Sequence, residues 1–385
     1  MSVYFPREDS FLLQKFVKAF AKGKSLDMGT GSGIQAVTAA SNKSVNSVLA
    51  VDADKKAIDY CRKNIKNKKI IFKKSDLFSN AKGKFDTIIF NPPYLPEDGY
   101  KRDISVIGGK KGYETAERFL DNSGRHLNPE GIILLLFSSL TRKEKIDEII
   151  EKNAFVSEQL AEKAVGLYEK LYVYLIKKSD LLKKLEKIGV KDIKKFAKGK
   201  RGVIYVGIYK NKKVAVKIQR PDVQVKTIKN EIDCLKKLNK HGIGLKVIFP
   251  EKGYFVYEFV EGDFIEDFIG KTKKQAIKKV LKNVMLQCRI LDKLKVNKEE
   301  MHHPPKHIIV TKKQNPVLVD FERCKKTRDP KNVTQFCQYL ISGKLGYLLK
   351  EKGIRINREK MIELAKKYKK DFNENSFKEI LKSIS

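Results

Sequence analysis

The sequence predicts an α/β protein whose first half is a doubly wound, mostly parallel sheet with an antiparallel edge strand, followed by a separate α+β domain. Three observations predict this fold class. Apolar runs alternate with amphipathic segments up to residue 178, and the last two runs, near residues 155–159 and 171–176, form a closing strand pair. A glycine-rich turn at residues 29–33 joins a strand to a helix. Beyond residue 198 the pattern changes to short, alternating strands.

The length of 385 residues favours two domains, and a hydrophobic content of 41% is enough for two cores. We place the first domain at residues 1–178 and the second at residues 199–385. Between them, residues 179–198 form a lysine-rich connector that begins as a helix.

The cysteines and the apolar runs bear on where the protein works. The five cysteines are scattered without any paired C-x-x-C spacing, which predicts a reducing cytoplasm and argues against a zinc site or disulfides. No apolar run reaches membrane-spanning length, and the first residues lack a signal-peptide pattern, so we expect no membrane association.

The charge is strongly positive, with 82 Lys and Arg against 46 Asp and Glu and a formal net charge of +36. Such an excess predicts contact with a polyanion, most simply RNA or the ribosome. The alternative is a compositional bias, because the excess is mostly lysine and is spread along the whole chain. Charge alone therefore does not define the substrate.

The first half opens with a helix signal at residues 4–13, and a strand, a glycine turn and a helix follow at residues 24–37. Asp27 ends the strand, and Gly29, Gly31 and Gly33 form the turn. The spacing differs from the G-x-G-x-x-G fingerprint of nicotinamide cofactors, but it still allows the backbone to approach a ligand closely.

Two further acids follow the next two strands. Asp52 closes the strand at residues 47–51, where a carboxylate can bind the two hydroxyls of a ribose. Asp76 follows the strand at residues 70–72 and can accept the amino group of an adenine. Together with Asp27 and the glycines, these acids predict a site for an adenosine cofactor. The alternative is a generic glycine turn with solvated acids.

A fourth strand, at residues 85–90, ends at Asn91, Pro92, Pro93 and Tyr94, because two prolines cannot continue a strand. The Asn91 amide and the Pro92 carbonyl can accept hydrogen bonds from a planar NH2 group, and Tyr94 can stack on it. This arrangement suits methyl transfer to a conjugated amino nitrogen, because the acceptors stabilise the positive charge that grows there. The alternative is an ordinary strand-ending turn.

These motifs occur in the order typical of class I S-adenosylmethionine methyltransferases, which have a Rossmann-like fold. Together with residues 4–13, they resemble the HemK family and are most similar to its archaeal and eukaryotic branch. A Gly-Gly-x-x-Gly segment at residues 105–112 adds to the similarity. The resemblance implies methylation of the glutamine in the Gly-Gly-Gln motif of class I peptide-chain release factors. It also implies a small activator subunit of the zinc-finger type. Relatives act on lysine or nucleic-acid amino groups, so an adenine-N6 methyltransferase of RNA or DNA is the alternative.

The second half begins with a strand, a glycine turn and a strand, containing Gly199 and Gly202. A Val-Ala-Val-Lys sequence ending at Lys217 follows, then a helical run containing Glu231 and an apolar strand at residues 254–262. Asp320 follows a further apolar strand. Their order resembles a bilobal protein-kinase-like domain, with small RIO-type or archaeal predicted serine/threonine kinases as the nearest group.

This second resemblance implies binding of ATP with Mg2+. Lys217 would contact the phosphates, Glu231 would pair with Lys217, the segment 254–262 would meet the adenine, and Asp320 would bind the metal. The alternative is a basic α+β domain with chance matches.

The segment where a kinase catalytic loop should stand departs from the family pattern. Alignment places His307 at the asparagine position and His302 at the aspartate position of H-x-D-x-x-x-x-N, with Lys306 near the phosphates. Glu322 replaces the glycine of Asp-Phe-Gly. Nucleotide binding is therefore better supported than phosphoryl transfer, and a ribosome-associated, nucleotide-dependent binding protein remains an alternative. The three histidines at positions 302, 303 and 307 also allow a metal site, which is a further alternative. Residues 332–385 are expected to be helical.

Overall fold

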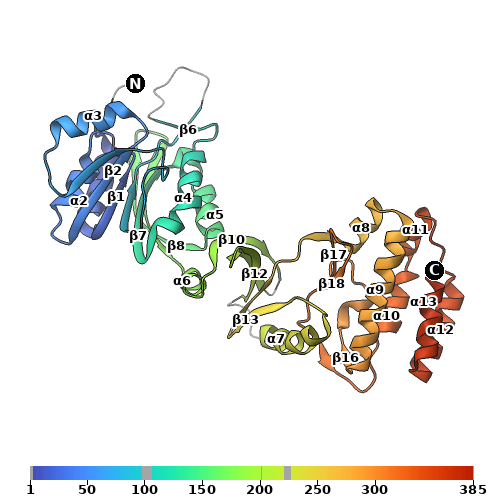
Figure 1. Cartoon of the computed structure of the whole chain (residues 1–385). Helices are drawn as coiled ribbons and strands as arrows, with labels where there is room; N and C mark the ends of the chain where they lie inside the picture. The colour runs from blue at the N-terminus through green and yellow to red at the C-terminus, as the bar shows by residue number, and fades with distance from the viewer. Residues whose placement is uncertain (1–2, 98–105, 201, 221–226, 385) are drawn as a thin grey trace. The chain divides into compact units, whose positions relative to one another are not determined.

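The computed structural model describes residues 3–97, 106–200, 202–220 and 227–384. The chain divides into two compact units, one of residues 1–196 with 207–211 and one of residues 197–206 with 212–385. Figure 1 shows the elements of each unit along the chain. The segment predicted as a connector forms helix α6 (Asp180–Lys187) and strand β10 (Lys191–Lys198).

The first unit contains a seven-stranded sheet in the order β3-β2-β1-β4-β7-β9-β8. Its strands are β1 (Gly23–Met28), β2 (Val45–Asp52), β3 (Ile70–Lys74), β4 (Phe85–Phe90), β7 (Leu127–Ser138), β8 (Phe155–Val165) and β9 (Glu169–Lys178). The first five run parallel, and β9 runs antiparallel to both of its neighbours. The doubly wound, mostly parallel sheet is thus confirmed.

One detail of the prediction is wrong: the antiparallel strand is not the edge strand. β8 and β9 form a hairpin joined only by residues 166–168, so they must be neighbours and antiparallel. β9 also pairs with β7 along residues 171–177, which leaves β8 at the edge. Residues 171–176 of β9 are all apolar and buried, as expected for a strand that is covered on both faces of the sheet.

Five helices cover the sheet: α1 (Glu8–Phe20), α2 (Ile34–Ser41), α3 (Lys55–Asn64), α4 (Glu114–His126) and α5 (Lys143–Lys152). Buried side chains of α1, α2 and α3, including Leu13, Ala39 and Ile58, share one core with the strands. On α4, Phe119 packs on Phe90 of β4 with 4.6 Å between ring centroids. Figure 1 shows α2 on the other side of the sheet from α4 and α5. Helices on both faces bury the central parallel strands.

A five-stranded sheet in the order β10-β11-β12-β14-β13 follows along the chain, and most of its residues belong to the second unit. The remaining strands are β11 (Gly202–Tyr209), β12 (Lys212–Gln219), β13 (Val247–Glu251) and β14 (Tyr254–Glu258). β14 is antiparallel to both β12 and β13. Helix α7 (Thr227–Leu238) contributes Leu235 and Leu238 to the core of this unit.

The rest of the unit is mainly helical and carries short strands between its helices. Its elements are β15 (Gly262–Phe264), α8 (Ile265–Lys271), α9 (Lys274–Lys293), β16 (Val296–Asn297), η3 (Glu299–His302), β17 (Ile308–Thr311), β18 (Pro316–Leu318), β19 (Lys325–Lys326), α10 (Asn332–Leu340), α11 (Gly343–Glu351), α12 (Arg358–Asp371) and α13 (Glu374–Ser383). The predicted helical ending is confirmed. Core side chains such as Met285, Phe336 and Tyr368 come from α9, α10 and α12.

The cysteines contradict the sequence prediction. Cys234 of α7 and Cys324 form a disulfide, whereas Cys61, Cys288 and Cys337 are free and buried. The bonded pair is separated by 90 residues, so local spacing could not reveal it. The cysteines therefore no longer support a reducing compartment. Among the residues that the structure describes, no helix is long and apolar enough to cross a membrane.

Candidate functional site

A pocket of about 860 Å3 opens at the carboxyl ends of the parallel strands in the first unit. Eight of the predicted site residues line it: Gly29, Gly31, Asp52, Asp76, Asn91, Pro92, Pro93 and Tyr94. Asp27 and Gly33, which the sequence also placed at the cofactor, are not among the lining residues. The volume suits a cofactor of nucleoside size together with part of a second molecule.

Asp27 holds the glycine loop from inside. Its side chain is buried and accepts hydrogen bonds from the Thr30 hydroxyl (2.6 Å) and from the backbone N–H of Ala36 (3.0 Å). Burial raises the pKa of Asp27 to about 7, although these two hydrogen bonds act in the opposite direction. Asp27 thus fixes the turn between β1 and α2.

The three glycines of the loop all have positive φ, at 65° for Gly29, 53° for Gly31 and 87° for Gly33. A Cβ on Gly33 would lie 2.4 Å from the Ile65 Cδ1 atom. A side chain at Gly33 is therefore disfavoured by its positive φ and by contact with Ile65, the residue after α3, while Gly29 and Gly31 line the pocket.

Asp52 ends β2 and connects this strand to the glycine loop. Its carboxylate accepts the N–H groups of Gly31 and Asp54, each at 2.9 Å. Burial raises its pKa above the ordinary value, and these backbone bonds partly offset that effect. The loop and the acid are therefore one preformed unit.

Asp76 lines the next part of the pocket, where it pairs with Arg118 of α4 at 2.8 Å. Both side chains are well exposed, so the pair is weak and can open for a ligand. The sequence prediction missed Arg118, which lies in a helix without any motif.

Asn91 is oriented by two residues from the start of the chain. Its Nδ2 donates to the Asp9 carboxylate at 2.9 Å, and the Tyr4 hydroxyl donates to the same Asp9 oxygen at 2.7 Å. Asp9 is itself buried and also accepts the Ser10 N–H. Because the amide nitrogen is held by a carboxylate, the Oδ1 atom must be the free end. Within the described part of the chain, this buried Oδ1 has no hydrogen-bond partner.

The turn after Asn91 rests on the glycine-rich segment. A Cβ on Gly108 would lie 2.5 Å from the Pro93 carbonyl oxygen, and one on Gly112 would lie 2.6 Å from the Tyr94 carbonyl oxygen. Strands β5 (Leu95–Pro96) and β6 (Ile107–Gly109) pair beside the turn. Glycine is therefore required where the two backbones meet; Ser105, at the start of the predicted segment, lies outside the described residues.

Tyr94 lines the pocket and is largely enclosed. Burial and the negative charges of Asp9 and Glu169 raise its pKa well above the ordinary value, so the phenol stays neutral. Glu169, at the start of β9, also lines the pocket. Its Oε1 atom is buried and lacks a hydrogen-bond partner among the described residues. The sequence prediction did not include Glu169.

A second charged site lies in the second unit, around Lys217 on β12. The Lys217 amine contacts the carboxylates of Glu231 at 2.6 Å, Glu322 at 2.8 Å and Asp320 at 3.4 Å. Burial would lower the pKa of Lys217, but the three carboxylates outweigh this effect and raise it. The predicted Lys217–Glu231 pair is thus present, and Glu322 joins it.

Gly202 lies next to this lysine, and Gly199 donates its N–H to the Gly202 carbonyl at 2.9 Å. A Cβ on Gly202 would come within 2.9 Å of the Ile218 carbonyl oxygen and 3.7 Å of the Lys217 side chain. The glycine turn therefore lets two strands approach closely near the amine.

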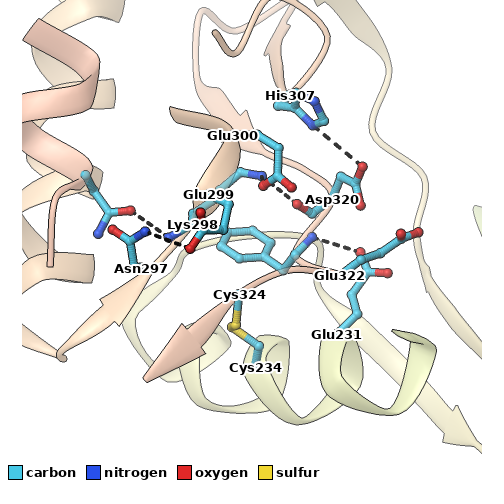
Figure 2. A network of polar contacts seen from close by, with 12 residues as sticks. Glu231, Cys234, Asn297, Lys298, Glu299, Glu300, His307, Asp320, Glu322 and Cys324 are labelled. Carbon is cyan, nitrogen blue, oxygen red and sulfur yellow. Dashed lines mark hydrogen bonds and ion pairs between the residues drawn. A yellow bond between two sulfur atoms is a disulfide. The ribbon is translucent and has the colours of Figure 1, made fainter. Parts of the chain in front are cut away.

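The peptide bond between Asp320 and Phe321 is held from both sides. The buried Lys298 amine donates to the Asp320 carbonyl, and the Glu231 carboxylate accepts the Phe321 N–H at 3.1 Å. Figure 2 shows Glu231, Lys298 and Asp320 together with Glu300, whose carboxylate lies 3.2 Å from the Lys298 amine. Asp320 has a φ of 64°, an unfavourable conformation for this residue type, and these bonds stabilise it.

The predicted catalytic-loop residues are only partly brought to this site. His307 lies 3.6 Å from the Asp320 carboxylate, and burial and the Lys298 charge lower its pKa. His302 is exposed and contacts the Glu299 carbonyl of its own turn, and Lys306 is also exposed. The alignment did not assign Lys298, which donates to the Asp320 carbonyl, or Glu300, whose carboxylate contacts the Lys298 amine.

The carboxylates could hold a divalent cation. Glu231, Asp320 and Glu322 each offer an oxygen, and these oxygens lie within 4.8 Å of one another. Hard cations such as Mg2+ prefer oxygen ligands of this kind. The positive charges of Lys217 and Lys298 lower the pKa of Asp320 even though burial opposes this, so Asp320 is ionised.

Comparison with known proteins agrees with the geometry of the first unit. The model of the Methyltransferase small domain family matches residues 8–164. A putative protein N5-glutamine methyltransferase of Methanocaldococcus jannaschii is 37% identical over 155 residues, which cover 38% of this chain and 78% of that protein. A release factor glutamine methyltransferase of Aquifex aeolicus is 28% identical over 40% of this chain and 60% of its own length. The structure of the E. cuniculi Mtq2–Trm112 complex, responsible for methylation of the termination factor eRF1, shows 24% identity and a TM-score of 0.39, and covers 46% of this chain and all of that one.

The parallel sheet, the glycine loop with its acid and the strand-end Asn-Pro-Pro-Tyr define an S-adenosylmethionine-dependent methyltransferase. More closely, the chain belongs, through its first unit, to the HemK-type family of protein N5-glutamine methyltransferases. The predicted enzyme class is confirmed. The matched segment spans less than two thirds of the Aquifex relative.

Proposed function

We propose that the first unit, within residues 1–178, methylates the side-chain amide nitrogen of a protein glutamine. The acceptor would be the Gly-Gly-Gln motif of a class I peptide-chain release factor. One observation carries this proposal: Asp9 holds the amide nitrogen of the pocket-lining Asn91, and the buried Oδ1 atom has no hydrogen-bond partner among the described residues. A buried acceptor without a donor is costly, so the site favours a ligand that brings an N–H group.

The acceptor amide is held by this chain's own oxygens. The Asn91 Oδ1 atom accepts one N–H of the glutamine amide, and the Pro92 carbonyl accepts the other. Both oxygens stabilise the positive charge that develops on the nitrogen during transfer. Tyr94, which stays neutral, lies against the amide plane and excludes water. No base is needed beforehand, because the nitrogen gains acidity as it is methylated and then releases its proton.

The residues around the glycine loop fit S-adenosylmethionine. The preformed contact of Gly31 with Asp52 places a carboxylate in the pocket at the end of β2, where a ribose diol can bind. Asp76 and the backbone of Gly29 are the further candidates for the adenine and the amino-acid part. When bound, this cofactor supplies an electrophilic methyl group on a positively charged sulfur.

A test compares methyl transfer by the full chain and by Asn91→Ala, with labelled S-adenosylmethionine and a class I release factor. Loss of one aligned acceptor should lower kcat by roughly 100- to 1,000-fold. Cofactor binding, measured by calorimetry, should be unchanged. Asn122→Ala, an exposed position on α4, is the matched control. Full activity of Asn91→Ala would contradict the proposal.

The alternative acceptor is an adenine amino group in RNA or DNA, since it is also a planar NH2 group on a conjugated ring. The net charge of +36 favours contact with nucleic acid. Nuclease treatment of a labelled cell extract separates the two: a nuclease-resistant, release-factor-sized product supports the glutamine. A nuclease-sensitive product supports the adenine.

We infer a second function for residues 199–385, binding of ATP with Mg2+ in a kinase-like domain. The contact of Lys217 with Glu231 at 2.6 Å, next to Asp320, supports it. Phosphoryl transfer to serine or threonine has less support, because His302 and Lys306 lie exposed. Lys217→Ala or Asp320→Ala in the full chain should abolish MgATP binding, whereas Lys212→Ala, exposed on the same strand, should retain it.

The HemK resemblance also leads us to propose a small zinc-finger-type activator subunit and a cytoplasmic site of action. Copurification from the native cell tests the first of these, and fractionation tests the second. Ribosome contact through the basic surface is a further proposal, tested by cosedimentation with ribosomes.

A further inference from the structure

The tip of the β8–β9 hairpin carries two side chains that are almost fully exposed. Leu167 is 90% exposed and Tyr168 is 91% exposed, which are the highest values among the exposed large hydrophobic residues described. Gly166, the first residue of this tip, has a φ of 63° and open space around it. Adjacent exposed apolar side chains form a patch of the kind that marks an interaction site.

The tip continues directly into the pocket of the methyltransferase site. Val165 and Glu169, the residues that flank it and pair across the two strands, both line that pocket. The exposed side chains therefore lie, along the chain, between two residues that line the pocket.

The side chain of Glu169 carries a buried carboxylate oxygen. Its Oε1 atom is buried and has no hydrogen-bond partner among the residues described, as is also true of the Asn91 Oδ1 atom in the same pocket. Both atoms are acceptors, so both can receive an N–H donor from a ligand. In the proposed function the target amide donates to the Asn91 Oδ1 atom. The Glu169 Oε1 atom is left to accept a different N–H group.

The hairpin is fixed next to the site. The Lys170 N–H donates to the Ser139 hydroxyl at 3.0 Å, and Lys163 pairs with Glu8 of α1 at 3.0 Å. Lys170 also pairs with Glu162 across the strands at 2.7 Å. The hydrogen bond of the Lys170 backbone restrains the tip most, because exposed ion pairs such as these two contribute little.

We propose that residues 165–169 of this hairpin dock the acceptor polypeptide, with Leu167 and Tyr168 packing on an apolar surface of the folded protein and Glu169 accepting a backbone N–H beside the target glutamine. The inference rests on the proposed function and identifies the parts of the substrate that residues 165–169 bind. A polypeptide offers backbone N–H groups next to its side chain. A nucleic acid would bring phosphates toward the Glu169 carboxylate, which repels them.

The test uses the full chain with a class I release factor and with a short peptide containing its Gly-Gly-Gln motif. Glu169→Ala should raise KM for both acceptors by about 10- to 100-fold, the expected effect of losing a hydrogen bond to a charged group. Glu169→Gln, which keeps an acceptor oxygen, should recover much of the loss. Leu167→Ser with Tyr168→Ser should raise KM for the folded release factor by about tenfold or more and leave the peptide unaffected.

Val156→Ser and Glu158→Gln, exposed on β8 away from the tip, are the matched controls and should behave as wild type. Cofactor affinity and melting temperature should be the same for all variants. Unchanged KM values for the tip and Glu169 variants would overturn the docking proposal while the glutamine assignment stands. If the tip variants instead dissociate a dimer of the chain, the tip is a self-association surface and the proposal is wrong. If wild type methylates neither acceptor, the proposed function fails and the docking proposal fails with it.

Discussion

The carboxyl group of Asp27 is enclosed by the glycine loop, and its protonation is coupled to folding. Its pKa in the folded protein is about 7, above the ordinary value of 3.8, so the folded state binds this proton more tightly than the unfolded state. The associated stability is fully present below about pH 4 and is lost as pH rises through about 7. Asp27→Asn keeps an oxygen for Thr30 and Ala36 but cannot ionise.

We therefore predict that Asp27→Asn flattens the pH dependence of unfolding. Between about pH 4 and about pH 7, the difference in free energy of unfolding from wild type should change by up to about 4 kcal/mol. Urea denaturation at a series of pH values measures it. Asp59→Asn, on the exposed face of α3, is the control. Parallel curves for wild type and Asp27→Asn would contradict this coupling.

A site residue could be predicted from the sequence when its role follows from the residues next to it in the chain. Glycines at the turn, acids at strand ends and Asn91 before two prolines all satisfy this condition, and all of them except Asp27 and Gly33 line one pocket. Site residues that come from distant parts of the sequence could not be predicted. Asp9 lies 82 residues before Asn91, and Glu169 lies in a hairpin without any motif. Lys298 was missed because the alignment assumed a kinase loop.

At the scale of elements, the Asn-Pro-Pro-Tyr turn depends on the short strand β6. A Cβ on Gly108 would lie 2.2 Å from the Gly112 carbonyl oxygen and 2.5 Å from that of Pro93. We predict that Gly108→Ala displaces the turn and lowers kcat by about 100-fold, since small misplacement of reacting groups is costly. Cofactor affinity should change little. Gly124→Ala, whose Cβ would meet nothing closer than 3.7 Å, is the control, and equal kcat values for the two variants would contradict the prediction.

The disulfide between Cys234 and Cys324 joins α7, which carries Glu231, to the segment after Asp320. It closes a loop of 90 residues, for which chain entropy predicts about 4 to 5 kcal/mol of stability. We expect the variant Cys234→Ser with Cys324→Ser to unfold at a lower urea concentration than wild type. Reductant should lower the midpoint of wild type to the same value and leave the double variant unchanged. If reductant has no effect on wild type, the bond does not stabilise this unit.

Helices and strands could be predicted where the hydrophobic periodicity and the turn residues indicate the same element at the same position. Helix α1, the strand–loop–helix of β1 and α2, and the helices from residue 332 onward lie where the pattern placed them. The order of the last two strands was not predictable. Periodicity shows that β8 and β9 exist, but only packing against β7 determines which of them takes the edge.

At the scale of the whole molecule, the net charge of +36 predicts strong binding to polyanions that weakens steeply with salt. We expect retention on a heparin column to fall sharply as salt rises. Methylation of a protein acceptor should nevertheless survive nuclease treatment, because the pocket presents acceptors for N–H groups and an acidic Glu169. If nuclease treatment abolished methylation, the result would show that the positive charge binds a nucleic-acid substrate.

The two units differ in how far sequence could define them. Motifs of the first unit are dense and ordered, and relatives confirm its family. In the second unit the predicted Lys217–Glu231 contact is present, but both the kinase-like domain and its activity stay predictions. Chemistry at the Asn91 site is therefore the central claim.

One measurement tests that claim most directly: mass spectrometry of a class I release factor after incubation with the full chain and isotopically labelled S-adenosylmethionine. We predict one labelled methyl group on the glutamine of the Gly-Gly-Gln motif. The label should be absent with Asn91→Ala and present with Asn122→Ala. A label on lysine, on another glutamine or only in nuclease-sensitive material would contradict the assignment.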